Sequence, residues 1–163
     1  MNKFVLKDLI LQTMIAAIYV VLVYVFQFAS FGLIQFRIAE VLMILVLFDK
    51  KSVIGLTIGC FFANVLGGAI ILDVIFGTLA TTIAAILMIL TKKVIWVSLL
   101  MPAVVNGIIV GLLLTYAYDL GMLYITIPAV FIGEFLVLFV IGLPLYKALK
   151  DNSHFHELFH QKK

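Results

Sequence analysis

Charged side chains are scarce in this chain of 163 residues, because only 12% of the residues are Asp, Glu, Lys or Arg. A typical soluble domain carries about 25%. Hydrophobic residues make up 66% of the sequence, and the mean hydropathy is +1.31. A soluble globule of this composition would aggregate, so the sequence predicts a single integral membrane domain, residues 1–163, with little mass outside the bilayer.

Cysteine is almost missing too, and the one that occurs, Cys60, lies in an apolar segment. A single cysteine excludes an intrachain disulfide and a cysteine-rich metal site, so we expect it to be a packing residue. The phosphate-binding loop G-x-x-x-x-G-K-[ST] is also missing, which excludes ATP hydrolysis by this chain on its own. We therefore predict a protein that is not an enzyme and that carries no cofactor and no metal.

One stretch near the end, HELFH at residues 156–160, matches the H-E-x-x-H pattern of zinc proteases. His156 and His160 would bind the metal and Glu157 would act as the base. The three residues that follow supply no third ligand and no mass to shape a substrate cleft. We expect residues 150–163 to form an amphipathic cytoplasmic tail on the membrane surface. A membrane metalloprotease is the alternative, and it requires bound zinc.

Long apolar runs dominate the rest of the sequence. A helix needs about 20 apolar residues to cross the hydrocarbon core, and no strand-like alternation indicates a β-barrel. The first run is longer than the roughly 7–15 apolar residues of a signal peptide, and no cleavage site follows it. The sequence therefore predicts an all-α membrane fold with six transmembrane helices, of which the second is short, at roughly 9–29, 35–48, 52–69, 73–90, 94–117 and 124–149.

The ten lysines predict the orientation of these helices. They lie before the first segment, between the second and third, between the fourth and fifth, and near or after the end of the sixth. If six helices cross the membrane, all four of these regions lie on the same side of it. Because cytoplasmic loops collect Lys and Arg, that side is the cytoplasm and both termini face it. The lysines are Lys3, Lys7, Lys50, Lys51, Lys92, Lys93, Lys147, Lys150, Lys162 and Lys163.

The opposite half of the predicted helices and its loops hold four of the eight acids and the one arginine. Ionisable groups inside a membrane are candidates for function because burying them is costly. This half therefore predicts a pocket that opens outward, and the apolar cytoplasmic half argues against a continuous polar channel. The candidate substrate-binding residues are Arg37, Glu40, Asn64, Asp73, Asn106 and Glu134.

The charged candidates near the start of the second and within the sixth segment each allow two interpretations. Arg37 and Glu40, in QFRIAEVL, are three residues apart and share a helix face. They form an ion pair with each other, or they contact a ligand. Glu134, in VFIGEFLVL, is flanked by apolar residues on both sides. It pairs with Arg37, or it faces a polar cavity.

The other candidates also have structural alternatives. Asn64 and Asn106 suit hydrogen bonds between helices as well as a ligand contact. Asp73 opens its segment, where a carboxylate complements the helix dipole, so capping explains it as well as binding does. Gly107 and Gly111 form a G-x-x-x-G pattern, which is typical of close helix packing.

Five stretches occur in a fixed order: FGLIQFRIAEVLMIL, GLTIGCFFANVLGG, ILDVIFGTLATTIAAIL, NGIIVGLLLTYAY and IGEFLVLFVIGLPL. Together they resemble the QueT family of queuosine-precursor transporters, from about residue 9 to 146. The resemblance implies the substrate-binding (S) component of an energy-coupling factor (ECF) importer in a bacterial plasma membrane. It implies capture of queuine or aminomethyl-7-deazaguanine from outside. It also implies partners, a transmembrane coupling (T) subunit and two cytoplasmic ATPases, that make the S component topple and deliver its cargo.

Two further expectations depend on this resemblance. S components present an A-x-x-x-A face on the first helix to the T subunit, and the matching positions here hold Ala16 with Val20 and Ala17 with Val21. The pattern is only partly kept, so the docking face is less clear than the fold.

The implied substrate suits the polar candidates. A carboxylate, of Glu134 or Glu40, would accept the adjacent N–H and amino groups of a guanine edge, and an asparagine would read the ring carbonyl. Phe31, Phe36 and Tyr116 are candidates for stacking on the ring, and a cationic aminomethyl group suits a negatively charged pocket. The alternatives are another vitamin or purine as cargo, or a structural subunit in which the two glutamates tolerate loss of charge.

Overall fold

The computed structural model describes residues 5–30, 36–152, 155 and 159. All regular elements in this part of the chain are helices, which confirms the predicted all-α class. Phe31 and the HELFH residues His156, Glu157 and His160 lie outside the described residues. The helices are α1 (Leu6–Val25), α2 (Gln27–Ser30), the 3₁₀-helix η1 (Ile38–Leu47), α3 (Ser52–Leu66), α4 (Ile71–Thr91), α5 (Ile95–Tyr116), α6 (Leu123–Leu136), the π-helix η2 (Val137–Gly142) and α7 (Leu143–Lys150).

Helices occupy the six places where the sequence predicts spans, since α6, η2 and α7 form one continuous helix of 28 residues. Four helices are long and apolar enough to cross a membrane, namely α1, α4, α5 and α6–η2–α7. The other two, η1 and α3, have 10 and 15 residues. The protein is thus a multi-pass membrane protein, while the number of spans and the cytoplasmic position of the termini stay predictions.

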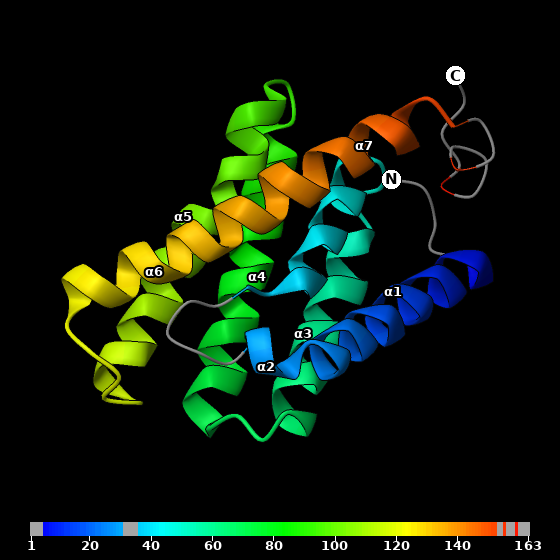
Figure 1. Ribbon diagram of the computed structural model, residues 1–163. Helices are drawn as coiled ribbons and strands as arrows, with labels where there is room; N and C mark the ends of the chain where they lie inside the picture. Colours follow the sequence, from blue (N-terminus) through cyan, green and yellow to red (C-terminus); the bar gives the residue numbers. More distant parts are fainter. Residues whose placement is uncertain (1–4, 31–35, 153–154, 156–158, 160–163) are drawn as a thin grey trace.

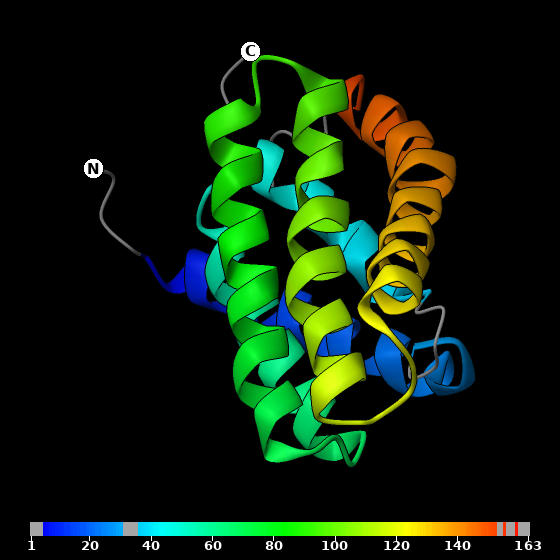
Figure 2. The same ribbon diagram turned by 90° about the vertical axis from the view of Figure 1, so that its left-hand side faces the viewer.

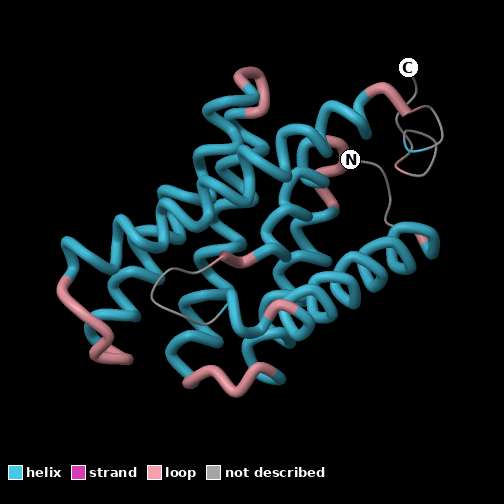
Figure 3. Tube along the Cα trace, in the orientation of Figure 1, coloured by secondary structure: helices cyan, strands magenta, loops and turns pink. Residues whose placement is uncertain are grey.

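The long helices pack in chain order. α5 packs against both α4 and α6, and α3 packs against both α1 and α4. Figure 2 shows α4 and α5 side by side, with the α6–η2–α7 helix next to α5. The described loops join helix ends (Figure 3). In Figure 1, α6–η2–α7 slants across the other helices.

The 3₁₀-helix η1 lies at the centre of this arrangement, in contact with α1, α3, α4 and η2. Its sequence, IAEVLMILVL, is apolar except for Glu40, and a helix that is apolar on all sides favours an interior position. Met43 and Ile44 are fully buried. At a rise of about 2 Å per residue, η1 is about 20 Å long, which is shorter than the ~30 Å core. The short second segment is therefore an internal element.

Glycines allow α1 and α3 to pack closely. A Cβ atom on Gly59 would lie 2.8 Å from Cβ of Tyr19 and 3.0 Å from Cα of Ala16. Ala16 is accordingly buried inside the chain, whereas Ala17 and Val21 are exposed and Val20 is half-buried. Of the four residues predicted to dock a partner, Ala16 is thus already covered by α3.

The G-x-x-x-G pattern of α5 faces α6. A Cβ atom on Gly111 would lie 2.9 Å from Cα of Ile127, and one on Gly107 would lie 3.2 Å from Cβ of Phe131. These glycines therefore allow α5 and α6 of the same chain to pack closely, as predicted.

Two described residues of the tail, Phe155 and Phe159, pack against aromatic rings. The ring of Phe155 lies 5.1 Å from the ring of Phe48 and 4.7 Å from that of Phe159. Phe48 also contacts Tyr146, at 5.3 Å. Phe159 is only 8% exposed. At these two positions the tail differs from the expected surface-lying helix, because its aromatic side chains bury area against the end of η1 and α7.

Candidate functional site

All six predicted substrate-binding residues are buried, with at most 3% of their surface exposed. They come from five different parts of the fold: the start of η1, α3, α4, α5 and α6. Hydrogen bonds and one ion pair join them into two groups, one around Asp73 and Glu40 and the other around Glu134. We call these six residues, together with the side chains that form hydrogen bonds with them, the polar cluster.

Arg37 pairs with Asp73. Its Nη2 atom lies 3.6 Å from Oδ1 of Asp73, which is an ion pair without a hydrogen bond. The predicted local pair of Arg37 with Glu40 is therefore not the contact that the arginine makes. Asp73 lies in the first turn of α4, but no side chain caps that helix. Its main contacts are with the cation and with its neighbours from other elements.

Asp73 is held in place from two sides. The hydroxyl of Tyr118, in the loop between α5 and α6, donates to Oδ2 of Asp73 at 3.2 Å and accepts from the backbone N–H of Ile70 at 3.4 Å. The amide of Asn64 donates to the backbone oxygen of Asp73 at 3.4 Å. A Cβ atom on Gly77 would lie 2.9 Å from Oδ1 of Asp73, so only glycine leaves room for this arrangement.

Glu40 accepts two hydrogen bonds on one oxygen. Tyr19 donates to Oε1 at 2.6 Å and Thr81 donates to the same atom at 3.0 Å. Thr81 also lies 3.3 Å from the sulfur of Cys60, which in turn accepts from Asn64 at 3.6 Å. Cys60 is buried, as predicted for a packing residue, yet it also links the two halves of this hydrogen-bonded group.

Glu134 is paired with Asn106 rather than with Arg37. Nδ2 of Asn106 donates to Oε1 of Glu134 at 3.1 Å, so α5 and α6 share this bond. The two groups lie on elements that pack together, since η1, which begins beside Arg37 and carries Glu40, contacts η2, the continuation of the helix that carries Glu134.

Several polar atoms of the cluster are buried without a hydrogen-bond partner among the described residues. Leaving such atoms unmatched costs about 1–3 kcal/mol each, and more for charged groups. The cluster also holds three carboxylates against one guanidinium. It is therefore suited to a molecule that carries several N–H donors and a positive charge. The atoms are Nη1 and Nη2 of Arg37, Oε2 of Glu40, Oδ1 of Asp73, Oδ1 of Asn106 and Oε2 of Glu134.

Sequence reasoning missed Tyr19, Thr81 and Tyr118, which belong to the cluster, and Gly77, which leaves room for Asp73. The chain contains six tyrosines, eleven glycines and several other threonines within apolar helices. Nothing in the local sequence separates these four from the rest, because their partners lie on other elements.

Two grooves lie on the outside of the described fold. One, of about 640 Å³, lies between α4 and α5 and contains Phe76 and Tyr116 in its lining. The other, of about 490 Å³, contains Phe36. Phe36 and Tyr116 therefore cannot stack on the same ring in this arrangement. Neither lining includes the charged residues of the polar cluster.

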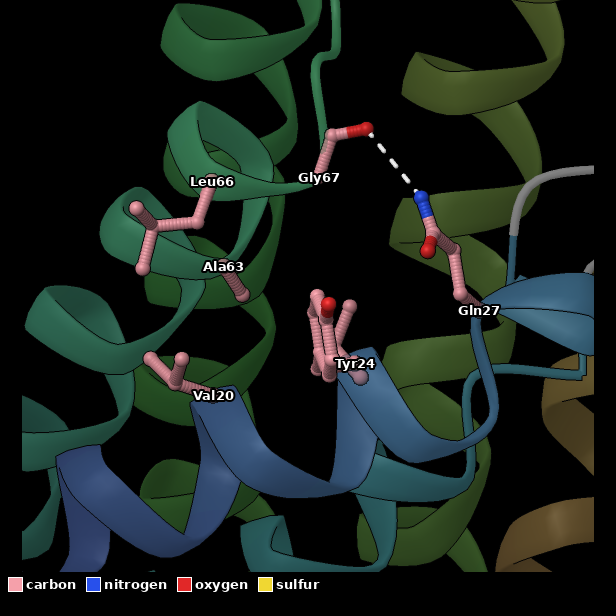
Figure 4. A pocket seen from close by; sticks show the side chains of 7 residues that line it. Val20, Tyr24, Gln27, Ala63, Leu66 and Gly67 are labelled. Carbon is pink, nitrogen blue, oxygen red and sulfur yellow. Dashed lines mark hydrogen bonds between the residues drawn. The ribbon is translucent and has the colours of Figure 1, made fainter.

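A third cavity between α1 and α3 is too small for a nucleobase. Figure 4 shows its lining, with the amide of Gln27 donating to the backbone oxygen of Gly67 at 3.5 Å. Its volume of about 10 Å³ is close to that of one water-sized probe.

Replacing Tyr118 by phenylalanine should lower stability by about 1 kcal/mol at pH 7, because it removes the donor to Asp73. Partial burial, together with the charge of Asp73, raises the pKa of Tyr118 above its ordinary value of about 10. A raised folded-state pKa means that the stabilising contribution is complete below pH 10 and is lost as the pH rises through the raised pKa. Thermal unfolding of parent and variant at pH 7 and pH 11 checks this, and an equal difference at both pH values would contradict it.

Comparisons with known proteins connect the sequence to one transporter family. The chain matches the family described as QueT transporter over residues 9–151. It is 38% identical over 85 residues to the queuosine precursor transporter QueT of Lactococcus lactis subsp. cremoris (strain MG1363). That alignment covers 51% of this chain and 50% of the relative, so it spans about half of each protein. No solved structure matches the chain.

Proposed function

This chain belongs to the QueT transporter family, and from that premise we propose that it captures a queuosine precursor, queuine or aminomethyl-7-deazaguanine, for import. A transporter family agrees with the prediction that the chain is not an enzyme. The observation that carries the proposal is the pair of fully buried glutamates, Glu40 and Glu134, each with one carboxylate oxygen free to accept further hydrogen bonds.

Glu134 is the better candidate for reading the guanine edge. Its Oε1 accepts one bond, from Asn106, whereas Oε1 of Glu40 already accepts two. The ring N–H and the exocyclic amino group of a 7-deazaguanine point the same way, so one carboxylate can accept both in charge-assisted bonds. The free Oδ1 of Asn106 is an additional acceptor beside it.

The remaining groups of the cluster suit the rest of the molecule. The N–H groups of Arg37 have no hydrogen-bond partner among the described residues and can donate to the ring carbonyl. Arg37 is a better donor for this carbonyl than Asn106, because Nδ2 of Asn106 already donates to Glu134. The free Oε2 of Glu40 is an acceptor for the protonated aminomethyl arm. A cation at this place would bring the charge of the cluster closer to balance.

We further propose that this chain acts as the S component of an ECF importer in a bacterial plasma membrane. No phosphate-binding loop occurs in the sequence, so the energy would come from partners: a T subunit and two cytoplasmic ATPases that topple the S component. On α1, the exposed side chains of Ala17 and Val21 are available to the T subunit, together with the half-buried Val20.

The test is equilibrium binding to the purified chain in lipid nanodiscs. Queuine and aminomethyl-7-deazaguanine are compared with 7-deazaguanine, which lacks the cationic arm, and with riboflavin as an unrelated vitamin. We expect tight binding of the first two, at least tenfold weaker binding of 7-deazaguanine, and none of riboflavin. Absence of binding by both precursors to a folded chain would overturn the assignment of the cargo.

A further inference from the structure

Two side chains from different helices hold one oxygen of Glu40. Tyr19 of α1 donates to Oε1 at 2.6 Å, and Thr81 of α4 donates to the same oxygen at 3.0 Å. Glu134 accepts one bond from the described residues, from Asn106 at 3.1 Å. Glu40 is therefore the more firmly held of the two glutamates.

The bond from Tyr19 has the length of a hydrogen bond to a charged acceptor. O–H donors lie about 2.5–2.7 Å from an ionised oxygen and about 2.7–2.8 Å from a neutral one. The observed distance of 2.6 Å belongs to the first class. The carboxylate of Glu40 is fully buried, and a buried charge needs such donors in place of the water that it has lost. The hydroxyl of Tyr19 therefore compensates the negative charge of Glu40.

Packing leaves the hydroxyl of Tyr19 little freedom to move. Only 1% of the surface of Tyr19 is exposed. Gly59 of α3 brings the two helices together at this point, since a Cβ atom on that glycine would lie 2.8 Å from Cβ of Tyr19. The acceptor is confined as well, because η1 contacts both α1 and α4. The position of one donor is thus fixed by α1 and that of the other by α4.

The second oxygen of Glu40 is left for another molecule. Both donors bond Oε1, while Oε2 has no hydrogen-bond partner among the described residues. A carboxylate that is anchored through one oxygen presents the other in a set direction, so less ordering is required when a cation binds there. Without the hydroxyl of Tyr19, the carboxylate would be held by Thr81 alone. The direction of Oε2 would then be less fixed, and the charge would be less compensated.

We propose that Tyr19 is a positioning residue that sets the preference of the site for a precursor with a cationic arm. It acts through Glu40, whose free oxygen accepts from the protonated amine. This inference rests on the proposed function and adds a residue that determines which deazaguanine is taken. Glu134, on another element, reads the guanine edge, so recognition of the ring does not need Tyr19. The competing role is packing alone, in which Tyr19 only fills the space between α1 and α3.

The experiment measures equilibrium binding of aminomethyl-7-deazaguanine and of 7-deazaguanine, which lacks the arm, to the full chain in lipid nanodiscs. Tyr19→Phe keeps the ring and removes the hydroxyl. We expect it to weaken binding of the cationic precursor about tenfold and to leave binding of 7-deazaguanine within about twofold of the parent. The readout is the ratio of the two dissociation constants, which a general loss of packing does not change.

Three further measurements test the route through Glu40. Thr81→Val replaces the second donor hydroxyl by a methyl group and should change the ratio in the same direction. Tyr24→Phe is the matched control, because Tyr24 lies on the same helix but is 68% exposed, and it should bind both ligands like the parent. In a Glu40→Gln background, Tyr19→Phe should change the ratio by less than about twofold, because the charge through which it acts is gone.

The possible results separate this inference from the proposed function. If Tyr19→Phe weakens both ligands equally, or binds both like the parent, the positioning role is overturned. The same holds if Tyr24→Phe changes the ratio as much, or if the effect of Tyr19→Phe persists without the charge of Glu40. If Tyr19→Phe does not fold, an unchanged ratio in Thr81→Val overturns the proposal. If a folded parent chain binds no precursor at all, the proposed function fails first, and this inference fails with it.

Discussion

Glutamine in place of Glu134 is expected to weaken binding of aminomethyl-7-deazaguanine by about 100-fold or more. The change removes a charge from a fully buried side chain and replaces one acceptor oxygen with a donor NH₂ group. Each hydrogen bond to a charged group contributes about 1.5–3 kcal/mol, and 1.4 kcal/mol corresponds to a factor of ten. Equilibrium binding by the purified variant measures the effect. The fold should persist, because the glutamine oxygen can still accept from Asn106.

Two controls make this result interpretable. Asp119→Asn removes a charge from an exposed residue of the loop between α5 and α6, and asparagine tolerates its φ angle of 53°. This variant should bind like the parent. Glu40→Gln should weaken binding of the cationic precursor more than that of 7-deazaguanine. If Glu134→Gln binds as tightly as the parent, the guanine edge is read elsewhere, and Glu40 or Asp73 takes that role.

Replacing Arg37 by methionine is expected to destabilise the protein by about 3–5 kcal/mol. Methionine keeps most of the side-chain volume but removes the only cation that pairs with Asp73 in the described structure. Breaking a buried pair from one side leaves an uncompensated charge, and this is among the largest effects of single substitutions. Unfolding of the protein in mixed micelles, followed by circular dichroism, measures the loss.

A second substitution shows whether charge is the cause. In the Arg37→Met background, Asp73→Asn removes the unpaired carboxylate and should recover part of the lost stability. The same Asp73→Asn change in the parent should destabilise, because it leaves the guanidinium unpaired. If the double variant is less stable than Arg37→Met alone, the pairing of these two residues is not what holds the cluster together.

The positions of the helices could be predicted from the sequence because a membrane-spanning backbone must satisfy its own hydrogen bonds. Long apolar runs therefore become helices, and the predicted ranges lie within a few residues of the observed ones. The internal character of η1 and the π-helix in η2 could not be predicted. Both depend on how η1 packs against α1, α3, α4 and η2, and that packing leaves no signature in a uniformly apolar sequence.

The candidate residues were recognisable for a different reason. A charged or amide side chain in an apolar run is costly unless it is used, and all six that were selected on this ground are buried in the polar cluster. Their pairing was not predictable. The spacing of Arg37 and Glu40 suggests a local ion pair, yet the arginine contacts Asp73, 36 positions further along the chain, and the glutamate accepts from Tyr19 and Thr81.

The unequal lengths of the helices have a consequence for the surrounding membrane. With a rise of 1.5 Å per residue, α3 is about 22 Å long and α6–η2–α7 about 42 Å, against a hydrocarbon core of ~30 Å. A short helix thins the bilayer beside it, whereas a long one tilts or thickens it. One flank of the molecule thus favours thin membranes and another favours thick ones. Changing the acyl-chain length of the lipids is therefore expected to change the tilt of the protein relative to the membrane normal.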